Sequence, residues 1–355
     1  GEIAQKGCPV GSHQPTPAST GCSLVDSGHY APESGTGFQI PCPVGNYQPN
    51  TGSEDCIEVD SGHYAPGPAA TSQIKCDAGS YAPESGLGEC LLADPGHHVS
   101  DTGSDSQTAC SAGFHQPESG APECLANEIG HYTDESGTAE QIPCSLGTYQ
   151  SMIGATSCSE ADYGFHVSNL GSAGQEPCLL GTYQSSTGQS DCIDAEPGHY
   201  VDIREASGST ACGRGYYQPE GWQSECVDAD AGKHVRSTGS PSQTPCERGT
   251  FQEMGAQAEC TDSQPGYYVS TSGADFQTAC NAGTYQDAVG KMSCKEADVD
   301  HFVAASAAIN QEMCKGDSTQ PKRGQSSCIE IDTSPVIAMG AAAAAAVIVL
   351  ILVYT

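Results

Sequence analysis

The chain has few of the residues that build a large apolar core. Only 37% of its 355 residues are hydrophobic and 6% are aromatic, with a single tryptophan. A globular domain of this length buries most of its surface around apolar side chains, which this composition cannot supply. The composition therefore excludes one large hydrophobic core and predicts small modules that are each stabilised locally.

Basic residues are also scarce. Twelve Lys and Arg stand against 44 Asp and Glu, so the net charge is −32. A surface this acidic repels polyanions, which excludes nucleic acid and anionic membrane surfaces as partners. The basic residues are unevenly placed, because ten of the twelve lie from Arg204 onward and only Lys75 lies between Gly7 and Ile203.

Several functional motifs are missing. No Asn-x-Ser/Thr sequon occurs, so we expect no N-glycosylation. No Cys-x-x-Cys pair occurs either, and zinc sites favour such close pairs. The same residue types recur along the chain, so no unique set of nucleophile, base and charge-stabilising group stands out. We predict that the protein is not an enzyme and carries no metal or cofactor.

Cysteine, by contrast, is abundant. The chain has 20 Cys together with 43 Gly and 22 Pro. A chain that is rich in cysteine and poor in core residues is typical of disulfide-stabilised proteins in an oxidising compartment. We therefore expect an extracellular or cell-surface protein.

The cysteines follow a strict spacing in which gaps of 14 and 20 residues alternate, giving a period of 34. They are Cys8, Cys22, Cys42, Cys56, Cys76, Cys90, Cys110, Cys124, Cys144, Cys158, Cys178, Cys192, Cys212, Cys226, Cys246, Cys260, Cys280, Cys294, Cys314 and Cys328. Midway between them the same phrase recurs without cysteine, because Gly79 and Tyr81 follow Cys76 just as Gly96 and His98 follow Ala93. The repeat is therefore 17 residues long.

The 17-residue repeats are of two alternating kinds. Cysteine repeats have Cys at positions 0 and 14. Glutamine repeats mostly have a small or apolar residue at position 0 and Gln at position 14, with Ser209 as the exception. The Gln side chain has two N–H donors and one acceptor oxygen, so we predict that it ties down nearby backbone where no disulfide is present. The glutamines are Gln39, Gln73, Gln107, Gln141, Gln175, Gln243, Gln277 and Gln311.

The spacing also indicates how the cysteines pair. Bridges across the 14-residue gaps, from Cys8–Cys22 to Cys314–Cys328, use all twenty cysteines and lie within one repeat. Bridges across the 20-residue gaps would leave Cys8 and Cys328 unpaired and straddle two repeats, so we favour the first scheme. Each bridge then closes a loop of about 15 residues, for which the chain-entropy model gives roughly 3 kcal/mol.

Within a repeat, the pattern predicts a short extended segment, a turn and a return, clamped at its base by the bridge. Gly at position 3 would supply a positive φ or a close approach to the next repeat. Aromatic or imidazole side chains at position 5 would contact each other between stacked repeats. The predicted fold is an elongated solenoid or rod of small disulfide-rich β hairpins, with little regular secondary structure and one C-terminal helix.

The pattern Cys-x2-Gly-x-Tyr-x8-Cys resembles the cysteine-rich repeats of ephrin-receptor-like and tumour-necrosis-factor-receptor-like extracellular regions. The resemblance covers nearly all of residues 1–330 and implies an extracellular module. Such modules occur in receptors, adhesins and surface stalks. The chain departs from the receptor families because it lacks their further cysteines and its spacing is more uniform.

The predicted organisation has four parts. Residues 1–7 are the end of a preceding repeat, residues 8–330 the repeat array, residues 331–335 a short linker, and residues 336–355 an apolar helix. The uncharged segment Val336–Val353 would form a helix about 27 Å long, enough to cross a bilayer core. We expect a retained membrane anchor there; a cleaved lipid-anchor signal and a helix that packs against copies of itself are the alternatives.

Two recurring polar residues are candidates for metal binding, and both are better explained structurally. One acidic residue per glutamine repeat falls short of the six to eight oxygens that calcium takes, so we interpret it as a turn residue that bonds local backbone. The histidines of the Gly-His-Tyr type lie one per 34 residues, too far apart to share an ion, and other repeats replace them with Phe, Lys or Tyr. These candidates are Asp26, Asp60, Asp94, Glu128, Asp162, Glu196, Asp230 and Asp298, and His29, His63, His97, His131 and His199.

Two functions remain. The uniform repeats favour a structural rod, a cell-surface stalk or filament subunit that is anchored or assembled through its C-terminal helix. The alternative is a receptor or adhesin ectodomain that binds a protein or glycan. Its site would lie in the irregular repeats, where Trp222 and Arg236 are the candidate partner-binding residues, because Trp and Arg are enriched at binding hot spots.

Overall fold

A computed structural model describes residues 7–16 and 21–331. These residues form 38 strands of two residues each and contain no helix. Each paired set is an antiparallel two-stranded hairpin. In the repeat that begins at Cys144, strand β17 (Thr148–Tyr149) pairs with β18 (Ser159–Glu160), with Thr148 opposite Glu160 and Tyr149 opposite Ser159. Positions 4 and 5 of a repeat thus pair with positions 16 and 15, which confirms the predicted hairpin.

The strand bounds repeat with the same 17-residue period. The strands are β1 (Ser12–His13), β2 (Ser23–Leu24), β3 (His29–Tyr30), β4 (Ile40–Pro41), β5 (Asn46–Tyr47), β6 (Ile57–Glu58), β7 (His63–Tyr64), β8 (Ile74–Lys75), β9 (Ser80–Tyr81), β10 (Leu91–Leu92), β11 (His97–His98), β12 (Thr108–Ala109), β13 (Phe114–His115), β14 (Leu125–Ala126), β15 (His131–Tyr132), β16 (Ile142–Pro143), β17, β18, β19 (Phe165–His166), β20 (Glu176–Pro177), β21 (Thr182–Tyr183), β22 (Ile193–Asp194), β23 (His199–Tyr200), β24 (Thr210–Ala211), β25 (Tyr216–Tyr217), β26 (Val227–Asp228), β27 (Lys233–His234), β28 (Thr244–Pro245), β29 (Thr250–Phe251), β30 (Thr261–Asp262), β31 (Tyr267–Tyr268), β32 (Thr278–Ala279), β33 (Thr284–Tyr285), β34 (Lys295–Glu296), β35 (His301–Phe302), β36 (Glu312–Met313), β37 (Ser318–Thr319) and β38 (Ile329–Glu330).

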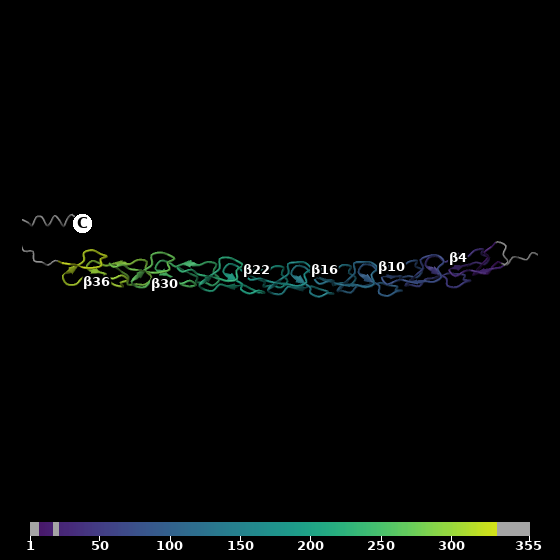
Figure 1. The fold of residues 1–355 in the computed structure, drawn as a ribbon, viewed down its shortest axis with the longest axis horizontal. Helices are drawn as coiled ribbons and strands as arrows, with labels where there is room; N and C mark the ends of the chain where they lie inside the picture. The colour runs from purple at the N-terminus through teal and green to yellow at the C-terminus, as the bar shows by residue number, and fades with distance from the viewer. Residues whose placement is uncertain (1–6, 17–20, 332–355) are drawn as a thin grey trace, which may run out of the picture. The chain divides into compact units, whose positions relative to one another are not determined.

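The chain divides into two compact units. Unit 1 comprises Gly1–Ile193 and Ile203–Gly208, and unit 2 comprises Asp194–Asp202 and Ser209–Thr355. Within unit 1, the hairpins that contain β4, β10 and β16 follow one another in chain order (Figure 1). Within unit 2, the hairpins that contain β30 and β36 do the same (Figure 1).

Backbone hydrogen bonds join each repeat to the next inside a unit. In unit 1, the N–H of Gly147 donates to Val167 O at 2.8 Å, and that of Gln150 to Ser172 O at 3.0 Å. The return bond runs from the N–H of Gly171 to Cys144 O at 2.8 Å. In unit 2 the corresponding bonds recur one for one, as in the 2.9 Å bond from Gly249 N–H to Val269 O. Because a two-stranded hairpin is marginal alone, this ladder is what makes the short strands stable.

The glycine at position 3 brings in the repeat after next. Gly147 has φ +79°, and a Cβ atom built on it would overlap the carbonyl oxygen of Gly188, which lies two repeats further along the chain. Glycine therefore serves both predicted purposes here, a left-handed backbone and a close approach.

The buried interior is thin and built from small side chains. Position 0 is fully buried in both kinds of repeat, as Cys144 in one and Val25 in the other. Large aliphatic side chains such as Ile153 and Leu170 are exposed instead. The structure thus confirms the absence of one large apolar core, and crosslinks and hydrogen bonds replace it.

The predicted C-terminal helix lies outside the described residues, as does nearly all of the predicted linker 331–335. Within the ranges 7–16 and 21–331, the structure has no helix with the length and apolar character that a bilayer span requires.

Candidate functional site

The disulfides pair as the spacing predicts. Ten bridges form, each between cysteines 14 residues apart, and the described residues include no free cysteine. In the Cys144–Cys158 bridge the Cα atoms are 5.7 Å apart, in the usual range for a disulfide. Each bridge therefore clamps the base of one hairpin.

The predicted hydrogen-bonding clamp in the glutamine repeats is also confirmed. Gln175 Oε1 accepts the backbone N–H of Asp162 at 2.6 Å, and Gln175 Nε2 donates to Asp162 Oδ2 at 2.7 Å. We call this pair of bonds the Gln–Asp staple. The complete staples are Asp26–Gln39, Asp60–Gln73, Asp94–Gln107, Asp162–Gln175, Asp230–Gln243 and Asp298–Gln311.

The staple also corrects the interpretation of the acidic residues at position 1. In the six complete staples, the carboxylate accepts from a glutamine side chain and not from local backbone, as we had expected. At Asp230 the Lys233 ammonium donates to the same oxygen at 2.8 Å and, ahead of Gln243, lowers the pKa of this carboxyl. A carboxylate that is already engaged in this way is a weaker candidate for calcium.

A second glutamine, at position 6 of the cysteine repeats, was missed from the sequence. In the repeat that begins at Cys144, Gln150 Nε2 donates to Ser157 O at 2.8 Å, and its Oε1 accepts the N–H of Met152 at 2.9 Å. The side chain thus fills and closes the loop inside the bridge, and it is buried. The same two bonds recur at Gln48, Gln116, Gln184, Gln218, Gln252, Gln286 and Gln320.

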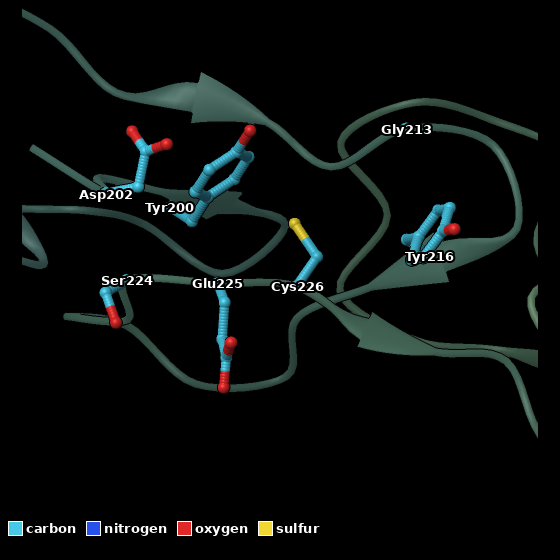
Figure 2. A pocket seen from close by; sticks show the side chains of 7 residues that line it. All are labelled: Tyr200, Asp202, Gly213, Tyr216, Ser224, Glu225 and Cys226. Atoms are coloured by element: carbon cyan, nitrogen blue, oxygen red, sulfur yellow. The ribbon is translucent and has the colours of Figure 1, made fainter.

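One cavity interrupts this regularity, in unit 2. It has a volume of about 500 Å³ and is lined by Tyr200, Asp202, Gly213, Tyr216, Ser224, Glu225 and Cys226. Figure 2 shows the Cys226 sulfur between the rings of Tyr200 and Tyr216, with the Asp202 carboxylate beside Tyr200. We call this the Tyr200 cavity.

The residues of the Tyr200 cavity are unusual for their positions. Tyr216 stands at position 4, where all but one of the other cysteine repeats have Ser, Thr or Asn, and Gly213 at position 1 has no side chain to fill the space. Ser209, the single exception to the glutamine pattern, belongs to the same repeat as Tyr200 and Asp202. Aromatic rings with a few converging polar groups are typical of small-ligand sites.

Trp222, one of the two predicted partner-binding residues, lies two residues before Ser224 of this cavity. Its side chain is 61% exposed, and its backbone is left-handed with φ 60°. A bulky residue in this conformation costs about 1–3 kcal/mol, and an exposed side chain gains little packing in return. The indole is therefore a poor choice for stability and suits contact with a partner.

Arg236, the other predicted residue, is exposed, and its carbonyl oxygen accepts Nε of Arg214 at 2.9 Å. Arg214 also forms an ion pair with Glu259 at 3.3 Å. No described contact joins Arg236 to Trp222 or to the Tyr200 cavity. The structure therefore does not bring the two predicted binding residues into one site.

The histidines of the Gly-His-Tyr type lie singly, as expected. Nδ1 of His63 is 3.2 Å from Ser61 O, and His29, His97 and His131 face the carbonyl two residues back in the same way. None of them belongs to a cluster of three potential metal ligands among the described residues.

A different set of histidines, at position 5, contacts disulfide sulfur. Cys124 Sγ lies 3.1 Å from Nδ1 of His98, and the same contact joins Cys192 to His166 at 3.3 Å and Cys260 to His234 at 3.2 Å. The sequence signal was the replacement of Tyr by His at position 5, but the contact runs between neighbouring repeats and could not be inferred from spacing.

No protein-family model matches this chain, and no curated protein shows significant similarity to it. Function therefore depends on the described geometry. Ten disulfides in a 34-residue periodic pattern fit an extracellular or secreted protein with a structural or binding role.

Proposed function

We propose that the protein is a non-catalytic structural element of the cell exterior, a stalk or filament subunit built from stacked hairpins. The observation that carries this proposal is the regular alternation of disulfides with Gln–Asp staples. A spacer needs equal repeats, whereas a ligand site needs at least one repeat that differs. The net charge of −32 would keep such an element soluble and self-repelling.

Attachment to the membrane through Val336–Val353 is part of the proposal. The support is the sequence alone, since 18 uncharged residues reach about 27 Å as a helix. Deletion of residues 336–353 in the full chain should release the protein from the membrane fraction into the medium. Release of the intact chain by phospholipase would instead indicate a lipid anchor.

The second candidate function is ligand binding, and the Tyr200 cavity with the nearby Trp222 favours it. Two tyrosine rings can stack on the apolar face of a sugar, and the carboxylates can accept its hydroxyl protons. Because Trp222 is the only tryptophan, its fluorescence reports on this region directly. A panel of neutral oligosaccharides is the probe, and Tyr216→Thr is the matched control, since Thr stands at this position in Thr148, Thr182, Thr250 and Thr284.

One experiment separates the two functions. Deleting a pair of repeats, either residues 161–194 or residues 195–228, keeps the 34-residue register and removes one disulfide in each case. For a structural element, both deletions should shorten the purified chain equally, as measured by small-angle X-ray scattering, and both should be displayed normally on cells. Loss of adhesion or ligand binding from the second deletion alone would overturn the purely structural function.

A further inference from the structure

Three of the ten disulfides have an imidazole nitrogen against one sulfur, and they recur every 68 residues. The groups are His98 with Cys110 and Cys124, His166 with Cys178 and Cys192, and His234 with Cys246 and Cys260. In each group one ring nitrogen and both sulfurs lie within 4.8 Å of one another. We call these the His–disulfide groups.

Packing does not require a histidine at this position. The other glutamine repeats have an aromatic residue there: Tyr30, Tyr64, Tyr132, Tyr200, Tyr268 and Phe302. Tyr200 lies beside the Cys226 sulfur in the same manner (Figure 2). The ring fills the same space in either case, so what histidine adds is a nitrogen lone pair next to sulfur.

While the bridge is intact, this nitrogen has only a weakly interacting disulfide sulfur to face. Reduction changes the chemistry, because a dithiol gives the bridge two electrons and two protons and is itself oxidised to a disulfide. The two new thiols then face the imidazole. Two thiolates and one imidazole are three of the four ligands of a tetrahedral zinc site, in which water can take the fourth position.

We propose that the three His–disulfide groups are latent Cys2His sites for a divalent cation of the zinc type, each opened by reduction of its bridge. Binding releases the two thiol protons to solvent, so two thiolates and a neutral imidazole hold the dication. The proposal concerns a site and does not depend on the structural function proposed above.

The geometry suits this change. In a tetrahedral site with Zn–S of about 2.3 Å, the two sulfurs lie roughly 3.8 Å apart, so opening a bridge moves them by less than the 4.8 Å that already encloses the three ligand atoms. Cys110 is fully buried, while His98 and Cys124 are half-buried, which leaves one side of the site for the fourth ligand.

The surrounding backbone is held independently of the sulfur atoms. The N–H of Cys110 donates to Gly96 O at 2.8 Å, and Cys110 O accepts the N–H of Gly137 at 2.8 Å. Glutamine repeats fold in the same array with the same bonds and no disulfide. We therefore expect a reduced His–disulfide group to keep its ligands near each other.

One of the three sites has an additional orienting group. His166 stands opposite Glu176 in the β19–β20 hairpin, and its Nε2 lies 3.9 Å from Glu176 Oε2. At this place in the other two groups, His98 faces Thr108 and His234 faces Thr244. A carboxylate on the free imidazole nitrogen fixes the ring and raises its basicity. The His166 site should therefore bind metal about tenfold more tightly than the other two, and Glu176→Thr should remove this difference.

The test is a Co²⁺ titration of the full chain after reduction by a phosphine, which takes oxygen from water as it is oxidised and leaves no competing thiol. Thiolate-to-cobalt absorption should saturate at three ions per chain and disappear when Zn²⁺ is added. His98→Tyr, His166→Tyr and His234→Tyr should each lower the stoichiometry by one, and Tyr132→His should raise it to four. All these variants use residues that the chain itself has at this position.

Cysteine protection is the second readout. With Zn²⁺ bound, peptide mapping after alkylation should show three protected cysteine pairs and seven modified pairs, and the unreduced variants should still show ten bridges. A stoichiometry that does not follow the histidine count would overturn the proposal. So would a reduced chain that loses its amide protection before metal binds.

Discussion

The Gln–Asp staple should be able to replace a disulfide in the middle of the array. The repeat that begins at Cys144 offers the test, because Ser145 occupies the place of the staple's Asp and Cys158 that of its Gln. The stapled variant is Cys144→Val/Ser145→Asp/Cys158→Gln. The matched control, Cys144→Val/Cys158→Ala, removes the bridge and adds no staple. Val fills position 0 without strain elsewhere, since Val25 and Val59 are fully buried there.

The magnitudes follow from the bonds. The bridge closes a loop of about 15 residues, so the control should lose roughly 3 kcal/mol of local stability. The staple adds two hydrogen bonds of about 0.5–1.5 kcal/mol each, so the stapled variant should recover about 1–2 kcal/mol. At about 1.4 kcal/mol per factor of ten, this difference is roughly five- to thirtyfold in amide protection.

Native-state hydrogen exchange is the appropriate assay, because opening in a repeat array is local and one global unfolding energy would average it away. Protection should be higher in the stapled variant for the amides of Gly147 and Gln150, and unchanged in repeats more than two away. Equal protection in the two variants would refute the idea that the Gln–Asp pair stabilises the hairpin.

Three further results are expected. Gly147→Ala should destabilise unit 1 by more than about 1 kcal/mol, because it combines a left-handed backbone with a Cβ that overlaps Gly188 O, whereas Gly174→Ala, which meets nothing within 4 Å, should be neutral in chemical denaturation. Trp222→Gly should raise stability by about 1 kcal/mol by relieving its φ of 60°, while Trp222→Ala keeps that strain and should not. Asn127→Val should cost about 1–3 kcal/mol, because it leaves the buried Thr133 hydroxyl without the 2.9 Å bond from Asn127 Nδ2, and adding Thr133→Val should restore most of the loss.

The sequence predicts much of the fold because the crosslinks are local. Every bridge and every complete staple joins residues 13 or 14 apart, as at Cys144–Cys158 and Asp162–Gln175. Interactions of fixed short separation leave a regular trace in a repeated sequence, so their partners can be found by alignment of the repeats alone. The hairpin, the pairing and the glutamine clamp all belong to this class.

The features that escaped prediction depend on contacts between repeats or on burial. His98 meets Cys124 across 26 residues, and nothing in their spacing distinguishes that contact from the tyrosine contact it replaces. Gln150 is buried because the loop of its own repeat folds over it, which composition does not indicate. The Tyr200 cavity exists because Gly213 omits a side chain, and its shape depends on three separate segments.

The alternation of two clamps has a mechanical consequence for a structural element. A disulfide does not open under forces that break hydrogen bonds, so each bridge withholds its 14-residue separation from extension. Ten such bridges withhold about 140 residues, roughly 500 Å of contour length. The glutamine repeats and the segments between bridges, such as residues 158–178, are free to open and close. Each is bounded by a bridge on both sides, so an opened repeat is returned to register by its neighbours. An array clamped only by hydrogen bonds would lose that register, and one clamped only by disulfides could not yield.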